Sequence, residues 1–188
     1  MRPCALTLTC VTLLVGPTVT VAQESSPSLE ATAAWLSSEL PKLTSIHYQR
    51  ITRSMSSGGD VAMAIDKRTS DVVLEGCTLR WTATHSVDGT VRLISKLSAP
   101  LGRVDKQAIT VGAAFTLAGV SHRPSVYTLN VRSPRTMGKP FTYQGASDPA
   151  PKPDFGFSFD FTDRKSAVRV AQALKRAATL CGAHAGPF

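Results

Sequence analysis

The chain has 188 residues and a formal net charge of +8 at pH 7. Its hydrophobic content of 43% excludes an intrinsically disordered chain, and its length allows one domain with its own core. The basic excess favours acidic partners such as lipid headgroups, polyanions or acidic proteins. No run of five Lys or Arg residues occurs, and basic residues do not alternate with aromatic ones, which argues against nucleic-acid binding.

The first 22 residues have the composition of a secretory signal peptide. Arg2 gives a positive start, an apolar region follows, and the small residues up to Ala22 fit a cleavage position. We expect residues 23–188 to form a single exported domain, either periplasmic or secreted, with a charge of +7 once Arg2 is removed. A retained anchor is the alternative, but Gly16 and Pro17 break the apolar run and leave it short for a bilayer.

Two of the four cysteines, Cys4 and Cys10, belong to the signal peptide. Cleavage as a lipoprotein at Cys10 is a weaker alternative, because Cys10 lacks the small residue that normally precedes such a site. The remaining pair, Cys77 and Cys181, predicts one disulfide in an exported chain. Two buried reduced thiols are the alternative reading. The two cysteines form no C-x-x-C pair, so we predict no metal site.

The N-terminal half of the domain predicts one helix followed by strands. Apolar residues at helical spacing indicate a helix over residues 29–40, which Pro41 should end. Residues 46–53 are expected to form the first strand. Two further strands, 61–67 and 71–74, are expected to flank a turn.

The clearest signal for a hairpin lies in the middle of the chain. Cys77, Leu79, Trp81 and Ala83 alternate with polar residues, so they predict a strand with one buried face. Asp88-Gly89 predicts the turn, and residues 90–98 return as the partner strand.

The C-terminal half contains more strands, a proline-rich segment and a long helix. Alternation predicts strands over residues 107–117 and 125–132. Residues 133–153 predict a long surface loop with a short strand near 141–143. One face of a last strand should bury four phenylalanines, and an amphipathic helix should follow and end at Gly182. These phenylalanines are Phe155, Phe157, Phe159 and Phe161.

This order of elements predicts an α+β fold of antiparallel strands with a short N-terminal helix and a C-terminal helix. We expect a strongly bent sheet, or a partly open barrel, that the C-terminal helix closes. The topology resembles a pleckstrin-homology-type barrel. An open antiparallel sheet with both helices on one face is the alternative.

Several short stretches resemble uncharacterised exported bacterial proteins. They are Trp35-Leu36, Gly76-Cys77-Thr78-Leu79 with Trp81, and Ala167-Val168-Arg169-Val170-Ala171-Gln172-Ala173-Leu174 followed by Leu180-Cys181-Gly182. The resemblance covers about a third of the mature chain and implies no particular activity.

No set of residues in the sequence has a recognised catalytic spacing, and no cofactor motif is present. We therefore predict neither a catalytic residue nor a cofactor. The candidate ligand-binding residues are Trp81 and His85 at the hairpin and three arginines near the proline-rich segment, Arg123, Arg132 and Arg135.

Three functions remain open at this point. The first is a binding or scaffolding module at the bacterial envelope that contacts a protein or an anionic envelope component. The second is a carrier of a small ligand, with its pocket at the mouth of the sheet. The third is a hydrolase with dispersed catalytic residues. The sequence favours the first and leaves the oligomeric state open.

Overall fold

The computed structural model describes residues 28–53, 58–114 and 126–183 of the chain. These residues form an α+β fold with one helix near each end and antiparallel strands between them, as predicted. In chain order the elements are α1 (Leu29–Leu43), β1 (Ile46–Arg53), β2 (Asp60–Glu75), β3 (Thr78–Val87), β4 (Thr90–Pro100), η1 (Leu101–Arg103), β5 (Thr110–Ala114), β6 (Val126–Arg132), η2 (Arg135–Met137), β7 (Phe141–Gly145), β8 (Lys152–Asp154), β9 (Gly156–Phe161) and α2 (Arg164–Leu180).

The strands form two separate sheets and do not close into a barrel within the described residues. The large sheet has the order β1-β2-β3-β4-β7-β8, and the small sheet has the order β5-β6-β9. All neighbouring strands are antiparallel. This differs from the single bent sheet that the sequence predicted, because β5, β6 and β9 pair with one another instead of extending the large sheet.

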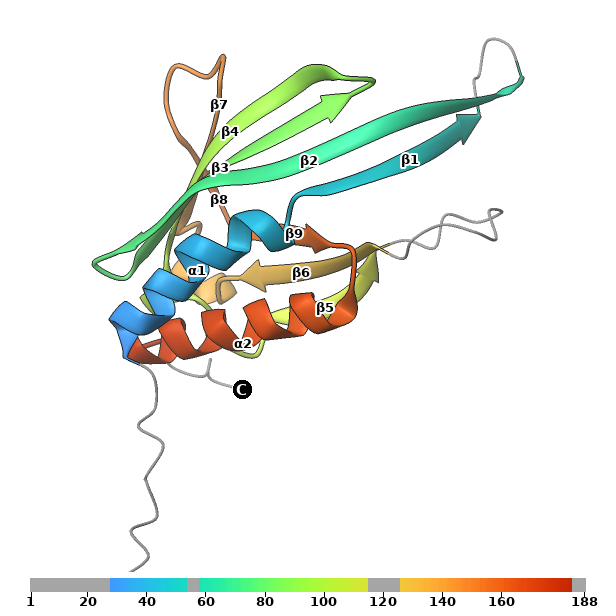
Figure 1. Ribbon diagram of the computed structural model, residues 1–188. Coiled ribbons are helices and arrows are strands. Elements are labelled where there is room, and N and C mark those ends of the chain that lie inside the picture. The colour runs from blue at the N-terminus through green and yellow to red at the C-terminus, as the bar shows by residue number, and fades with distance from the viewer. Residues whose placement is uncertain (1–27, 54–57, 115–125, 184–188) are drawn as a thin grey trace, which may run out of the picture.

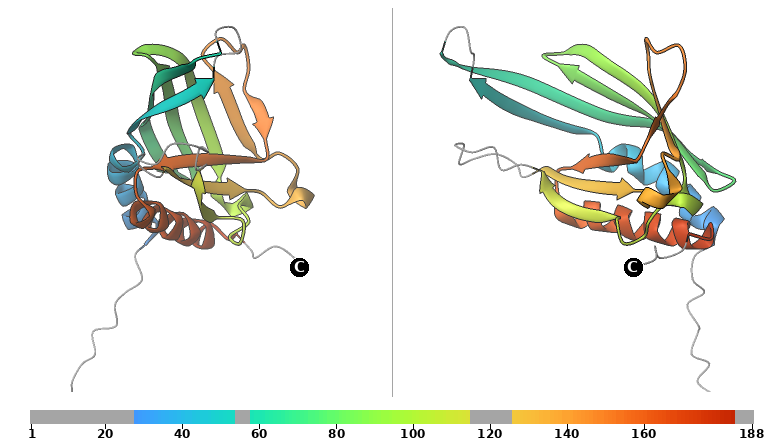
Figure 2. Two further views of the ribbon diagram at one scale, coloured as in Figure 1. Left: turned by 90° about the vertical axis from the view of Figure 1, so that its right-hand side faces the viewer. Right: turned by 180° about the vertical axis from the view of Figure 1, so that it is seen from behind.

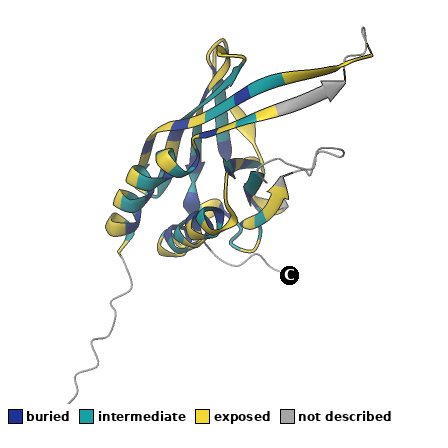
Figure 3. Ribbon diagram, turned by 45° about the vertical axis from the view of Figure 1, so that its right-hand side comes forward, coloured by how far each residue is buried: buried dark blue, intermediate teal, exposed yellow. Residues whose placement is uncertain are grey.

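The two sheets meet at one end of the molecule and diverge towards the tips of β1 and β2 (Figures 1 and 2). Helix α2 lies against the small sheet, and α1 lies beside both α2 and β2. Burial is greatest where the helices and the small sheet meet the large sheet, and the far end of β2 is exposed (Figure 3).

An aromatic cluster joins the two sheets at the end where they meet. The Trp81 ring of β3 lies 4.8 Å from the Phe157 ring and 5.1 Å from the Phe159 ring, measured between centroids. Phe141 of β7 packs edge-on against Phe157 at 5.4 Å. Burying each of these rings stabilises the fold by about 1.5–3 kcal/mol before entropy is subtracted. The large sheet and β9 are therefore held together mainly by aromatic packing.

Two short turns build the central hairpins of the large sheet. Asp88 and Gly89, the predicted turn, have φ values of 49° and 74°, and they connect β3 to β4. Gly76 and Cys77 connect β2 to β3 with φ values of 51° and 67°. Positive φ at both central residues is typical of the tight turn that matches strand twist. The sequence placed Cys77 in the strand, whereas it belongs to this turn, where a cysteine is unusual.

The disulfide pairing agrees with the sequence prediction. The Sγ atoms of Cys77 and Cys181 lie at disulfide distance, 2.12 Å apart, and the two Cα atoms are 5.6 Å apart. Cys77 belongs to the turn between β2 and β3, and Cys181 follows α2 directly. The bond therefore connects the C-terminal end of α2 to one corner of the large sheet.

Two predicted boundaries in the first half of the domain were wrong. Helix α1 does not stop at Pro41 but continues to Leu43, and Thr44 then donates both its N–H and its hydroxyl to the Leu40 carbonyl. Proline lacks an N–H donor, and a helix tolerates that loss better near its end, where few turns follow. The two short strands predicted around residues 68–70 form the single strand β2, and an irregularity after Ser70 replaces the predicted turn.

Two predictions for the C-terminal half also need correction. Phe155 precedes β9 and is 47% exposed, so it does not share the buried row of the other three phenylalanines. The proline-rich segment is more ordered than a surface loop, since it contains η2, β7 and β8. Prolines at strand ends and edges leave such short strands intact, because no ladder hydrogen bond is lost there.

Candidate functional site

A groove of about 900 Å³ lies between the small sheet and the large sheet near the aromatic cluster. Most of its lining comes from β6, β9 and the residues next to them. Leu97 of β4 and Asp154 of β8 belong to the large sheet. The lining residues are Leu97, Asn130, Val131, Arg132, Ser133, Asp154, Phe155, Gly156, Phe157 and Ser158. The groove thus offers both apolar and polar side chains to a ligand.

Strand alternation gives the small sheet two different faces. One, which we call the Phe face, carries Phe157, Phe159 and Phe161, all buried. The other face, which we call the open face, is formed by the residues that alternate with these phenylalanines in β9 and by the cross-strand partners of those residues in β6. The open face consists of Gly156, Ser158 and Asp160 of β9 with Arg132, Asn130 and Thr128 of β6.

The backbone packs tightly where the open face begins. Gly156 pairs with Arg132, and a Cβ atom at Gly156 would lie 2.6 Å from the Val131 carbonyl oxygen. Such a contact is too close for any side chain, so glycine is required at this position. The absence of a side chain there also leaves space above β9 for the groove.

An ion pair occupies the far end of the open face. Lys67 of β2 donates to Asp160 at 2.5 Å, and the Thr128 hydroxyl donates to the other carboxylate oxygen of Asp160 at 2.7 Å. Asp160 is mostly buried, with 15% of its side chain exposed. A carboxylate in that position requires compensation by a positive charge. This end of the face is therefore already neutralised by residues of the chain itself.

The groove end of the same face is not neutralised in this way. Among the described residues Arg132 makes no ion pair and its guanidinium makes no hydrogen bond. Asp154 also lines the groove, but one of its carboxylate oxygens accepts the Phe155 N–H at 2.6 Å. Lys139 lies 4.9 Å from the centre of the Phe155 ring. The groove therefore has a mixed but unpaired set of charges at this end.

His85 and Ser95 lie on the surface of the large sheet that carries Trp81. Register places Ser95 opposite Ala83 and His85 opposite Leu93 on neighbouring strands. The His85 Nε2 and Ser95 Oγ atoms are buried and have no hydrogen-bond partner among the described residues. Burial, followed by the positive charge of Lys67, lowers the pKa of the His85 imidazole. Neutral His85 is favoured as a result.

The structure separates the five ligand-binding candidates that the sequence suggested. Trp81 is 3% exposed and belongs to the core, whereas Arg132 lines the groove. His85 is partly buried on the large sheet and does not line the groove. Arg123 lies outside the described residues, as does the side chain of Arg135, whose backbone begins η2.

Most of the residues that line the groove were not among the predicted ligand-binding residues. Asn130 and Ser158 could have been identified from their alternation with buried residues of β6 and β9, since they occupy the polar positions of those strands. Phe155 gave no such signal, because it was expected in the core. No part of the sequence indicated that Leu97 of β4 would line the same groove as residues of β6 and β9.

The described residues contain no group of three or more metal-ligating side chains. No described helix is long and apolar enough to cross a bilayer. No known protein family, curated protein or solved structure matches the chain.

Proposed function

We propose that the protein is an exported, non-catalytic binding protein that holds a small amphipathic ligand in the groove between its two sheets. The observation that carries this proposal is the groove, whose volume of about 900 Å³ lies in the range of ligand pockets. Its combination of apolar and unpaired polar side chains is also typical of such sites. Among the three functions that the sequence left open, this observation favours the carrier.

Export is part of the proposal because two features support it. The N-terminal sequence has the pattern of a signal peptide, although residues 1–27 lie outside the described part of the chain. Cys77 and Cys181 lie at disulfide distance, and disulfides persist mainly in oxidising compartments. Both features support a protein that acts in the periplasm or outside the cell.

The hydrolase reading has less support than the binding function. A serine nucleophile needs a base within hydrogen-bonding distance. Ser95 Oγ has no hydrogen-bond partner among the described residues, so His85 does not activate it in this arrangement. We therefore treat the groove as a site of binding.

A neutral dye with a large apolar ring system, Nile red, tests the proposed site. We expect the mature protein, residues 23–188, to bind Nile red with increased fluorescence. The substitution Ser158→Trp fills the groove from its floor and should weaken binding at least about tenfold.

Ala62→Trp provides a matched control, because Ala62 is also an exposed small residue in a strand but does not line the groove. This variant should bind the dye as the unmodified protein does. Circular dichroism establishes whether both variants are folded. Equal dye affinity of folded Ser158→Trp and the unmodified protein would refute the groove as the binding site.

A further inference from the structure

We infer that the ligand of the groove carries an anionic oxyacid group, a carboxylate or a phosphate, which Arg132 binds while an apolar part packs on Phe155 and Leu97. This inference rests on the proposed function and specifies the chemistry of its ligand.

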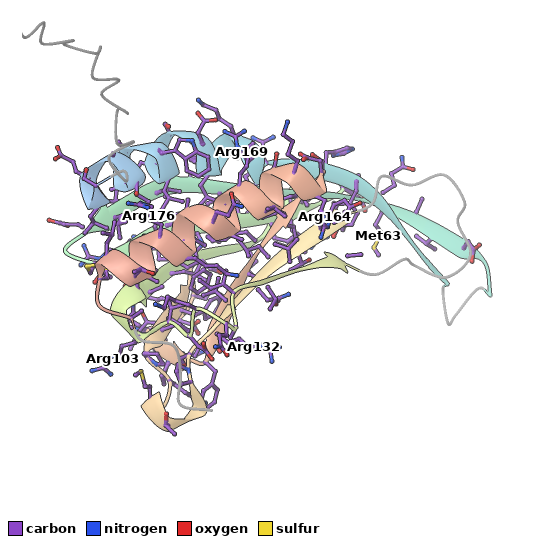
Figure 4. The ribbon with its side chains drawn as sticks, turned by 90° about the horizontal axis from the view of Figure 1, so that it is seen from below. Met63, Arg103, Arg132, Arg164, Arg169 and Arg176 are labelled. Atoms are coloured by element: carbon purple, nitrogen blue, oxygen red, sulfur yellow. A yellow bond between two sulfur atoms is a disulfide. The ribbon has the colours of Figure 1, made fainter. Side chains whose placement is uncertain are left out.

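The backbone of Arg132 is held in the small sheet, whereas its guanidinium has no partner among the described residues. Its carbonyl accepts the Asp105 N–H at 3.0 Å, and it is paired with Gly156 across the sheet. Its side chain is exposed and makes no ion pair with a described residue. In Figure 4, Arg132 lies apart from the three arginines labelled along α2. A planar guanidinium with five donors binds carboxylate and phosphate oxygens better than other side chains do.

Two further donors lie beside Arg132 on the open face. Asn130 precedes Arg132 by two positions in β6 and is paired with Ser158 of β9, so all three side chains share one face. Neither the Asn130 amide nor the Ser158 hydroxyl makes a hydrogen bond with another described residue. One cation with two neutral donors suits a single anionic group with several oxygen atoms.

The neighbouring charges also favour an anion at this end of the groove. Lys139, above Phe155, adds a second positive charge, and Asp154 adds one negative charge. Asp154 has one oxygen engaged by the Phe155 N–H, and no described ion pair joins it to Arg132. At the far end of the open face, by contrast, Lys67 already neutralises Asp160. The remaining positive charge is thus at the Arg132 end.

The apolar part of the ligand is indicated by Phe155. This side chain is 47% exposed, although its neighbours Phe157 and Phe159 are buried. Leu97 of the large sheet also lines the groove and is partly buried. A ligand in contact with both side chains would remove their apolar surface from water. An exposed aromatic ring beside an unpaired arginine therefore fits a molecule with an apolar body and one anionic group.

Competition against Nile red tests the inference with three probes that share a chain of twelve carbons: dodecanoate, dodecyl phosphate and dodecan-1-ol. We expect one or both anionic probes to displace the dye at concentrations at least about tenfold lower than the alcohol. Arg132→Gln should abolish this preference and leave the affinity for dodecan-1-ol unchanged. Arg132→Lys, which keeps the charge but loses the planar fork, should retain part of it.

Arg103→Gln is the matched control, since Arg103 is exposed in η1 and does not line the groove (Figure 4). It should keep the full preference for anions. Preference for one anionic probe alone identifies the group as carboxylate or phosphate. The inference is wrong if acid, phosphate and alcohol compete equally, or if Arg132→Gln and Arg103→Gln lose the same affinity. Dye binding that Ser158→Trp does not weaken would instead refute the proposed function, and the inference with it.

Discussion

The two faces of the small sheet are built by the same strands and have opposite surroundings. The Phe face is covered by α2 and by Trp81, and its three phenylalanines are each at most 9% exposed. The open face carries small or polar residues and borders a groove. The polar residues that line the groove therefore alternate in β6 and β9 with the buried residues that stabilise the fold, and Val131 and Phe157 of the buried register complete its lining. Substitutions on one face should affect unfolding, and substitutions on the other should affect binding.

The largest expected effect comes from the Phe face. Phe159→Ala removes a ring that is 4% exposed and packs on Trp81, so we expect a loss of about 3–5 kcal/mol in the free energy of unfolding. Ser158→Ala, the adjacent substitution on the open face, should change it by less than about 0.5 kcal/mol. Urea denaturation of both variants measures the difference. Comparable losses would show that the two faces do not divide these roles.

The disulfide should have the next largest effect, and it acts on the Phe face through α2. Replacing both Cys77 and Cys181 with alanine should lower the free energy of unfolding by about 2–5 kcal/mol. Nile red affinity should change little under conditions in which the variant remains folded. A loss of dye binding by the folded variant would mean that the helix side and the groove are not independent.

The Cys77–Cys181 disulfide and the removal of the signal peptide can be tested in one experiment. When the full chain is expressed in a bacterial host, the intact mass of the exported form should correspond to a chain that begins at Gln23. Thiol titration of that form, denatured without a reductant, should find no free thiol. Two reactive thiols per chain, or a retained segment 1–22, would contradict the disulfide and the signal peptide respectively.

The smallest effect concerns His85 on the large sheet. Since burial and Lys67 lower its pKa from the ordinary value of 6.5, the unfolded chain takes up this proton first as the pH falls. The free energy of unfolding should therefore decrease as the pH falls below about 6.5 and stop decreasing below the pKa of the folded protein. His85→Gln should lack this part of the pH dependence.

An NMR titration of the His85 ring gives its pKa in the folded protein directly. Because burial is the main cause of the shift, the pKa of His85 measures how far water is excluded from this part of the large sheet. A pKa at or above 6.5 would show that water reaches the imidazole. The surface around His85 would then be accessible to solvent.

Local patterns in the sequence predicted most of the elements. The alternating phenylalanines predicted β9, Asp88-Gly89 predicted the β3–β4 turn, and the alanine-rich stripe predicted α2. These signals depend on residues close to one another in the chain, so they predict local structure whatever the arrangement of the other elements. Boundaries were less certain, as Pro41 and the continuous strand β2 show, because packing overrides single residues that disfavour an element.

The groove could not be predicted in the same way. Alternation in β6 and β9 separates polar from apolar residues, but it does not say which element will face the polar side. The environment of the polar side is decided by how β9 packs, and β9 packs through Phe157 and Phe159 against Trp81 of the large sheet. Arg132 was identified only from the basic residues near the proline-rich segment, and Trp81 was assigned to binding although it belongs to the core.

The position of the disulfide also determines how the molecule responds to mechanical force. Cys77 and Cys181 are separated by 104 residues, and that interval contains every strand from β3 to β9 and every residue that lines the groove. Tension applied to the two ends of an oxidised chain passes through the bond and bypasses this interval. Only α1, β1 and β2 can be pulled out, with a gain of at most roughly 3.4 Å for each residue ahead of Cys77. The groove is thus in the part of the chain that such a pull cannot extend until the bond is reduced.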